Sequence, residues 1–81
     1  WMKVAGLAEA RNLPGTSHGI HDIHVHLLGA VPNGTYLEFH GFGLERFLEE
    51  PLSLRDGLAR APDRPGHGVS FIWDKLEAHR A

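Results

Sequence analysis

The spacing of apolar residues changes several times along the first half of the chain, and each change predicts a new element. A three- and four-residue period, typical of a helix, runs from residue 1 until Asn12 and the Leu-Pro pair after it end the helix. The same period returns between residues 20 and 31, where Pro-Asn-Gly breaks it. Stretches at residues 13–17 and 35–39 lie between turn residues and predict strands. The apolar positions that define the two helices are Trp1, Val4, Ala5 and Ala8, followed by Ile20, Ile23, Leu27 and Val31.

The second half of the chain has a different character and predicts shorter elements. In order, these are a short acidic helix at residues 44–50, a hairpin at 52–61, a strand at 68–73 and a final short helix. Asp56-Gly57 lies between two short apolar-alternating runs and is a strong signal for the hairpin turn. Asp74 and Glu77 have the spacing of a capping box, so we expect the last helix to open at Asp74.

The order helix, strand, helix, strand in residues 1–43 indicates the α/β class. Short connections between such elements are typical of a parallel sheet with crossover helices, either open or closed as a (β/α)8 barrel. The pattern changes after Gly43, so we divide the chain into an α/β body at 1–43 and a strand-rich segment at 44–81 that would cap it. The body supplies only two strands, which is a part of either architecture.

Composition and charge exclude several classes of function. A net charge of −2 without a Lys/Arg cluster argues against a nucleic-acid partner. The apolar runs fall far short of the roughly 20 residues that a membrane span needs. The lack of cysteine fits a reducing compartment, so the cytoplasm is the expected location. With 81 residues the chain would bury only about 60% of its unfolded surface, and Trp1 precedes Met2, which suggests truncation.

Four of the seven histidines lie within nine positions, which suggests a zinc site. On the predicted helix His21 and His24 share a face, whereas His26 points elsewhere. His18 precedes the helix, so the four rings would converge poorly. Asp22 and His26 stand four residues apart, a spacing that suits an ion pair on a solvated helix face. We therefore interpret His21, His24 and His26 as structural, with metal ligation as the weaker alternative.

His18 and Glu38 differ from the other polar residues because each marks the end of a predicted strand. The carboxyl ends of strands are where parallel α/β folds place their catalytic groups. A separation of 20 residues suffices for one crossover, so both should lie at one edge of the sheet, on strands roughly 4.8 Å apart. A base and an acid would then face one pocket, although a His and a Glu at strand ends could equally be a satisfied polar pair.

Longer stretches around these residues resemble the mandelate racemase subgroup of the enolase superfamily (mandelate racemase/muconate lactonizing enzyme-like). GTSHGIHDIHVHLLGAVP at 15–32, followed by YLE at 36–38, is similar to the seventh and eighth strands of that family's barrel with the helix between them. WMKVAGLAEA at 1–10 resembles its sixth barrel helix, and PDRPGHG at 62–68 its C-terminal signature. The resemblance covers almost the whole chain. It implies only the C-terminal segment of a modified (β/α)7β barrel, with residues 44–81 joining the capping domain.

The same resemblance implies roles for three residues. His18 would move the proton α to a substrate carboxylate, which suits a side chain with an ordinary pKa of about 6.5. Glu38, kept protonated in a dry pocket, would donate a hydrogen bond to the enediolate, and Ser17 would contact the substrate. The implied cofactor is Mg²⁺, held by three carboxylates outside this chain, where an Asp that orients the His also lies. The implied enzyme is a sugar-acid dehydratase or racemase, a homo-oligomer when complete.

Because the implied metal ligands and capping domain lie outside the matched residues, we expect the chain alone to be inactive. We also expect it to depend on the missing N-terminal portion of the barrel for its order. Two alternatives stay open here: a non-catalytic, His-rich metal-binding module, and a truncated gene product without activity. A zinc titration separates the first from the enzyme segment, and the coding DNA upstream of Trp1 separates the second.

Overall fold

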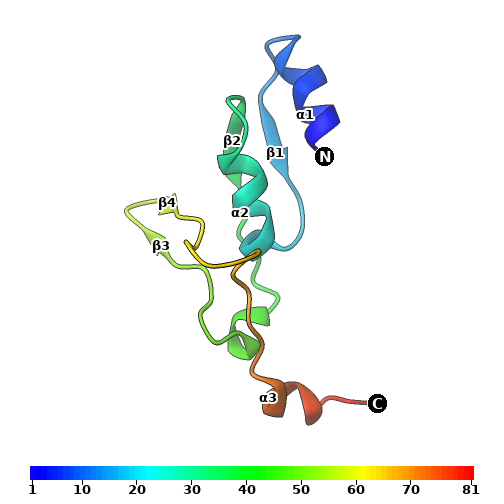
Figure 1. Cartoon of the computed structure of the whole chain (residues 1–81), viewed down its shortest axis with the longest axis vertical. Coiled ribbons are helices and arrows are strands. Elements are labelled where there is room, and N and C mark those ends of the chain that lie inside the picture. Colours follow the sequence, from blue (N-terminus) through cyan, green and yellow to red (C-terminus); the bar gives the residue numbers. More distant parts are fainter.

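A computed structural model describes all 81 residues and shows an α/β chain drawn out along one axis (Figure 1). Its elements are α1 (Met2–Glu9), β1 (Gly15–Ser17), α2 (His21–Gly29), β2 (Gly34–Leu37), the 3-10 helix η1 (Leu44–Phe47), β3 (Leu54–Arg55), β4 (Leu58–Ala59) and α3 (Trp73–Glu77). The helix, strand, helix, strand order expected from the apolar spacing is confirmed. The longest helix, α2, has nine residues, and none of the helices could span a bilayer.

β1 and β2 form a parallel pair, with α2 as the crossover between them (Figure 1). Gly15 pairs with Gly34, and Ser17 pairs with Leu37, so the offset between the strands grows from 19 to 20 residues. β2 therefore has one extra residue between the two pairs, and such an irregularity changes which side chains lie opposite each other. At an offset of 20, the residues that directly follow the two strands face one another.

Side-chain hydroxyls complete the hydrogen bonding where the register shifts. Thr16 Oγ1 donates to the carbonyl oxygen of Tyr36 over 2.5 Å. Thr35 Oγ1 donates to the carbonyl oxygen of Gly15 over 2.9 Å. Backbone carbonyls at the irregularity thereby find partners, which a short two-stranded ladder could not otherwise supply.

The first helix is fastened to the strand pair by one asparagine. Asn33, in the turn before β2, donates through Nδ2 to the carbonyl oxygens of Ala5 and Leu13, over 3.1 and 3.0 Å. The helix ends as the Asn-Leu-Pro pattern predicted, because Asn12 takes the left-handed conformation with φ 55°. At the start of β2 only Gly34 fits, since any side chain there would overlap a backbone carbonyl in the last turn of α2.

Two elements of the second half are shorter than the sequence predicted. η1 ends three residues before residue 50, because Leu48 is extended and forms an antiparallel bridge with Phe71. The prediction of a strand at 68–73 is wrong, since the pairing is reduced to this single bridge. The pairing stops where Pro51, which has no N–H, would face Gly68, whose φ is 70°.

The hairpin prediction is confirmed. β3 and β4 pair in antiparallel register, Leu54 with Ala59 and Arg55 with Leu58. The turn residues Asp56 and Gly57 both have positive φ, 52° and 73°. This is the conformation that a two-residue type I′ turn requires, and it explains the Asp-Gly sequence.

The start of α3 differs from the predicted capping box. Ile72 is the N-cap, and no side chain caps the helix, so Asp74 lies inside the first turn. The bridge determines this start, because the N–H of Ile72 donates to Phe47 and its carbonyl accepts the first helical bonds, including the one from Lys75. The side chain of Glu77 pairs with that of Arg80 instead of reaching back to the N-cap.

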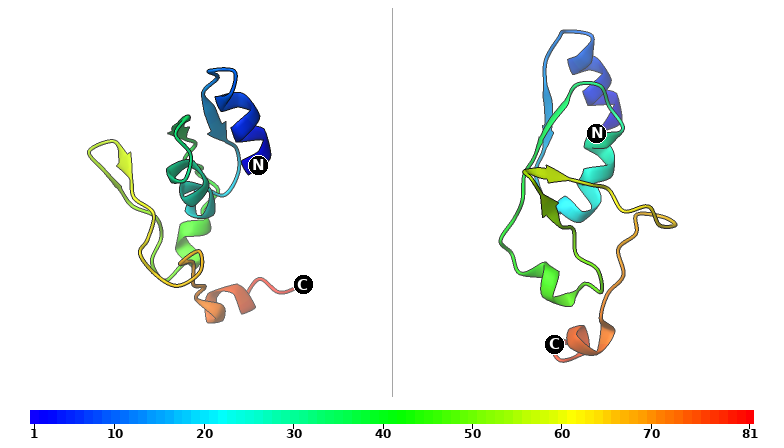
Figure 2. Two further views of the ribbon diagram at one scale, coloured as in Figure 1. Left: turned by 45° about the horizontal axis from the view of Figure 1, so that its top comes forward. Right: turned by 90° about the vertical axis from the view of Figure 1, so that its left-hand side faces the viewer.

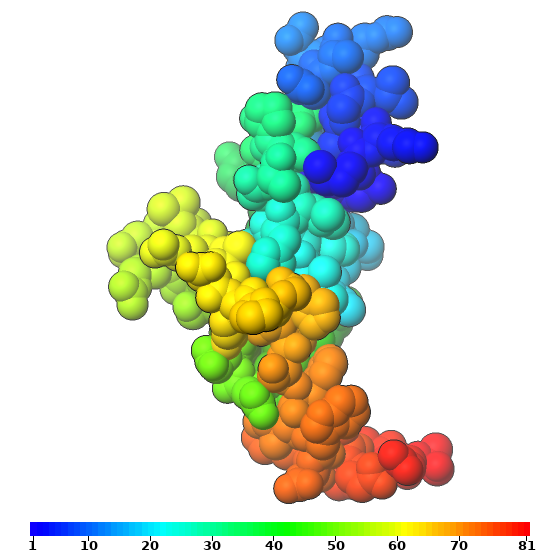
Figure 3. Space-filling model, viewed as in Figure 1, coloured from blue at the N-terminus to red at the C-terminus, as the bar shows by residue number.

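The molecule has little interior of its own. Six of the 81 residues are buried, and only Ala5, Val25 and Leu48 among them are apolar. The accessible surface is 6385 Å², compared with about 4,900 Å² for a compact 9.0 kDa protein, and the radius of gyration is 14.6 Å instead of about 12 Å. In Figures 2 and 3 the hairpin and α3 stand away from the central strand pair. The large apolar side chains left exposed include Val4, Leu7, Phe42, Leu58 and Trp73.

We expect the isolated chain to have low stability, because so little apolar surface leaves water to offset the entropy of ordering the chain. Thermal unfolding followed by circular dichroism should be broad. The dye ANS should bind the exposed apolar surface well below the transition. A monomer with a sharp, two-state thermal transition would contradict this expectation.

Candidate functional site

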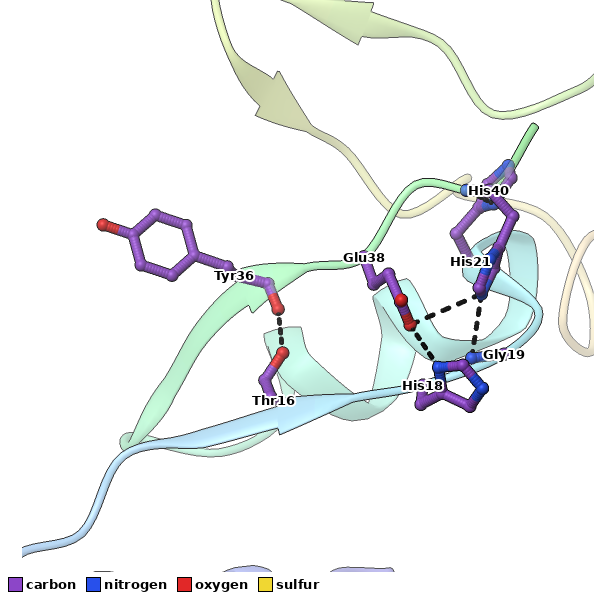
Figure 4. A network of polar contacts seen from close by, with 7 residues as sticks. All are labelled: Thr16, His18, Gly19, His21, Tyr36, Glu38 and His40. Carbon is purple, nitrogen blue, oxygen red and sulfur yellow. Dashed lines mark hydrogen bonds and ion pairs between the residues drawn. The ribbon is translucent and has the colours of Figure 1, made fainter.

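The loops after β1 and β2 bring His18 and Glu38 into direct contact (Figure 4). Nδ1 of His18 lies 2.7 Å from Oε2 of Glu38. Each residue directly follows its strand, so the parallel pairing turns both side chains toward the same edge. The prediction that the two residues lie together at one edge is confirmed. Both side chains are accessible, with exposed fractions of 85% for His18 and 45% for Glu38.

The contact leaves one ring nitrogen of His18 free. At 2.7 Å a proton lies between Nδ1 and Oε2, carried either by the imidazole or by a protonated carboxyl group of Glu38. When the imidazole carries it, Nδ1–H donates and Nε2 keeps its lone pair. In both cases Nε2 of His18 is the nitrogen that another molecule can reach.

A third side chain, His40, joins the pair, although the sequence pattern did not predict it. Nε2 of His40 accepts a hydrogen bond from the backbone N–H of Gly19 over 3.0 Å and lies 3.5 Å from Oε2 of Glu38. Its ring is also edge-on to that of His18, with centroids 5.4 Å apart. His40 thus connects the loop after β1 with the loop after β2. Its only sequence signal was its position two residues beyond Glu38.

A buried histidine and aspartate hold the loop after β2 in place. The N–H of His40 donates to Nδ1 of His21 over 3.1 Å, and the His21 ring stacks on Phe39 with centroids 4.0 Å apart. Nε2 of His21 lies 3.3 Å from Oδ2 of Asp22. Oδ1 of Asp22 accepts the N–H of Leu52 over 2.9 Å. These contacts connect the second half of the chain to the site.

The expected ion pair between Asp22 and His26 on a solvated face is wrong. Asp22 is buried, because the segment that contains Leu52 covers this face of α2. Nε2 of His26 instead contacts the carbonyl oxygen of His67 over 3.0 Å. His24 has a buried Nδ1 without a hydrogen-bond partner. His21 and His26 thus have separate partners, and the histidines of α2 do not converge on one point, in agreement with the structural interpretation.

Ser17, the third residue with an implied role, lies at the end of β1 directly before His18. Only 8% of Ser17 is exposed, so it is far less accessible than its neighbour. Contact with a substrate stays a prediction for Ser17, as proton transfer does for His18 and hydrogen bonding for Glu38.

Only one group of three metal-binding side chains converges in the chain, and it does not fit magnesium. His18, Glu38 and His40 offer ligand atoms that all lie within 4.8 Å of one another. Mg²⁺ demands oxygen ligands in near-octahedral geometry. Two imidazoles and one carboxylate do not provide these, so this group of side chains does not form a magnesium site.

Comparison with known proteins identifies the family. The family model described as enolase C-terminal domain-like matches residues 1–75. The chain belongs to this family. The match confirms the resemblance to the mandelate racemase subgroup of the enolase superfamily, and it makes the α/β arrangement a C-terminal part of that superfamily's barrel.

The names of individual relatives refer to sugar acids or to a racemase. A 3,6-anhydro-α-L-galactonate cycloisomerase from Streptomyces coelicolor is 55% identical over 76 residues, 94% of this chain and 21% of that protein. A D-xylonate dehydratase from Haloferax volcanii is 29% identical over 85 residues, with coverages of 95% and 21%. The crystal structure of a racemase from S. coelicolor A3(2) with bound magnesium superposes with a TM-score of 0.88 at 49% identity, covering 95% of this chain and 21% of that one. The chain therefore spans about a fifth of the length of these relatives.

The hydrogen bonds assign opposite tautomers to two neighbouring rings. Because Nδ1 of His21 accepts a hydrogen bond, the His21 proton should be on Nε2, whereas the His40 proton should be on Nδ1. Long-range ¹H–¹⁵N spectra at about pH 8, where imidazoles are neutral, and about 10 °C, near maximum stability, should show this difference. The same tautomer in both rings would contradict the assignment. His21→Phe keeps the stack on Phe39 but removes the acceptor, so the amide of His40 should exchange faster in that variant.

Proposed function

We propose that this chain forms the C-terminal part of a sugar-acid dehydratase or racemase that removes the proton α to the substrate carboxylate. The contact between His18 and Glu38 at one edge of the parallel strands is the observation that supports this most directly. The names of the two curated relatives, a galactonate cycloisomerase and a xylonate dehydratase, support sugar acids as the substrate class. Because the chain spans about a fifth of those proteins, the activity would belong to a larger protein.

His18 is the proposed base. Its Nε2 has no partner within the chain, and the exposed ring can be approached by a substrate. In the first step Nε2 would take the α-proton, while the electron pair of the C–H bond moves into the carboxylate to form an enediolate. Dehydration follows when this pair returns and expels the β-hydroxyl group together with a proton. Racemisation follows when a proton returns to the opposite face.

Glu38 is the proposed hydrogen-bond donor to the enediolate. The α-carbon and the carboxylate oxygens of a substrate are two bonds apart, so a single substrate reaches both His18 and Glu38 only if these side chains lie close together. When Nε2 takes up a proton, the proton on Nδ1 lies between atoms 2.7 Å apart. Its transfer to Oε2 would leave a neutral imidazole and a neutral carboxyl group that can donate. The 45% exposure of Glu38 means that residues outside this chain would have to close the dry pocket.

The remaining assignments place the chain within the larger enzyme. Residues 1–43 would supply the sixth helix, the seventh strand, the seventh helix and the eighth strand of the barrel, and residues 44–81 would reach the capping region. Ser17 would contact the substrate from the floor of the site, because it is nearly buried beside His18. Magnesium, which is bound in a related racemase, would be held by residues outside this chain.

A chimeric enzyme tests the proposal. Residues 1–75 would replace the corresponding segment of the S. coelicolor racemase, to which the chain is 49% identical. Exchange of the α-proton with deuterated water would be followed by NMR on a panel of sugar acids, together with formation of dehydrated product. Exchange or turnover by the chimera supports the proposal, and a folded chimera that shows neither contradicts it.

In the chimera, His18→Asn should lower the rate of α-proton exchange by about 10²–10⁴-fold, the usual contribution of general acid–base catalysis. Asparagine retains polarity but cannot accept a proton at neutral pH. His26→Asn is the matched control, because His26 contacts the carbonyl of His67 away from the pair, and it should leave the rate nearly unchanged. Equal losses in the two variants would mean that the fold, and not the base, had been affected.

Two substitutions of Glu38 separate a hydrogen-bond donor from an ionised carboxylate. Glu38→Leu should lower kcat of the chimera by about 10²–10³-fold, as loss of an oxyanion donor does. Glu38→Gln should cost less, because the amide still donates a hydrogen bond although it cannot take up a proton. If glutamine proved as damaging as leucine in steady-state assays, Glu38 would act through its charge or by taking up the proton of His18, and a role as hydrogen-bond donor alone would be refuted.

A further inference from the structure

The side chains of His18, Glu38 and His40 form a cluster that the proposed proton transfer does not fully use. Oε2 of Glu38 lies 2.7 Å from Nδ1 of His18 and 3.5 Å from Nε2 of His40. The three residues come from two loops, one after β1 and one after β2, and their side chains point toward a common point (Figure 4). The proposed proton transfer requires only His18 and Glu38, so His40 has no part in it.

The space between Glu38 and His40 is suited to a positive charge. Nε2 of His40 accepts the N–H of Gly19, so it carries no proton in the neutral ring. It faces Oε2 of Glu38 at 3.5 Å, a separation longer than a good hydrogen bond. Two electron-rich atoms thus face each other without a hydrogen between them, and a cation would stabilise this arrangement.

The donor atoms and their spacing fit an ion of the zinc type. With bonds of about 2.0–2.2 Å to nitrogen and oxygen, two ligands of a tetrahedral zinc ion lie roughly 3.3 Å apart. The separations from Oε2 of Glu38 to Nδ1 of His18 and Nε2 of His40, 2.7 and 3.5 Å, fall on either side of this value, and the three ligand atoms all lie within 4.8 Å of one another. Imidazole suits zinc, copper, iron and nickel, whereas magnesium prefers oxygen.

We propose that His18, Glu38 and His40 bind one Zn²⁺ or a similar transition-metal ion, with the fourth position open to water or a small ligand. This site differs from the one suggested by the histidine-rich helix, because His21 and His26 have other partners. The zinc proposal does not depend on the proposed enzyme activity, although both involve His18 and Glu38. An ion bound to Nδ1 of His18 would leave the one proton of the neutral ring on Nε2, so zinc binding and proton abstraction by Nε2 exclude each other.

Binding requires only local changes. His18 and Glu38 would exchange their mutual contact for bonds to the metal, and both are accessible. His40 would give up the hydrogen bond from Gly19, which is the one backbone bond that the ion replaces. The main chain of His40 is already fixed by His21, and its side chain is 9% exposed, so its ring is oriented toward the other two ligands. The ion would join the two loops and stabilise the β1–β2 pair.

Calorimetric titration of the 81-residue chain with Zn²⁺ tests the proposal. One ion should bind per chain, circular dichroism should show a gain of order, and a large excess of Mg²⁺ should not displace the zinc. His40→Ala should weaken binding at least about tenfold, since even loss of an outer partner costs about 10–100-fold. His79→Ala is the control and should bind like the unchanged chain, because His79 lies in the C-terminal segment and contacts the carbonyl of Lys75.

Absence of one-to-one binding overturns the proposal. So does binding that survives in His40→Ala but is lost in His26→Ala, which would place the ion on α2. If His40→Ala does not fold, the unchanged chain loaded with Co²⁺ gives a second measurement. Paramagnetic shifts should be largest for the rings of His18 and His40 and absent from His79, and the reverse pattern overturns the proposal.

The zinc experiment and the chimera experiment can fail independently. An inactive chimera would refute the proposed enzyme while leaving zinc binding by the chain intact. A chain that does not bind zinc would refute the zinc site, while the activity of a working chimera would still support the proposed enzyme. If both hold, added Zn²⁺ should inhibit α-proton exchange by the chimera, and His40→Ala should make the exchange at least about tenfold less sensitive to zinc.

Discussion

The alignment of two very short parallel strands determines what the rest of this chain can do. If the offset of 19 residues between Gly15 and Gly34 continued, His18 would face Leu37 and not Glu38. The extra residue in β2 raises the offset to 20, which is the separation of His18 from Glu38. Threonine hydroxyls hold the strands together where the ladder is interrupted. The local irregularity is therefore as important to the site as the strands themselves.

Contacts with the second half of the sequence also support this alignment. Asp22 accepts the N–H of Leu52 and lies against His21, which in turn accepts the N–H of His40. The segment around Leu52 thus stabilises, through Asp22 and His21, the loop that carries Glu38 and His40. These contacts support only one side of the His18–Glu38 pair, because the other side is open to solvent. A closed site would need further residues to cover that open side.

The sequence predicted the order of the elements and the meeting of His18 with Glu38, because both follow from apolar periodicity and the geometry of parallel strands. It failed for Asp22, since a helical period places a residue on a face but does not say which distant segment covers that face. His40 was missed for a related reason: its importance lies in contacts between loops, which have no spacing signal. The strand expected at residues 68–73 failed because Pro51 and the positive φ of Gly68 stop the pairing after a single bridge. The chemical roles proposed for His18 and Glu38 came from family resemblance and not from pattern.

The compact βαβ connection between His18 and Glu38 also has an evolutionary consequence. Both groups lie within a stretch of about 20 residues, joined by a single helix. Recombination between related genes would therefore exchange the two together, as one inherited block, while regions farther away diverge separately. A lineage could change what its members recognise without separating His18, the proposed base, from Glu38.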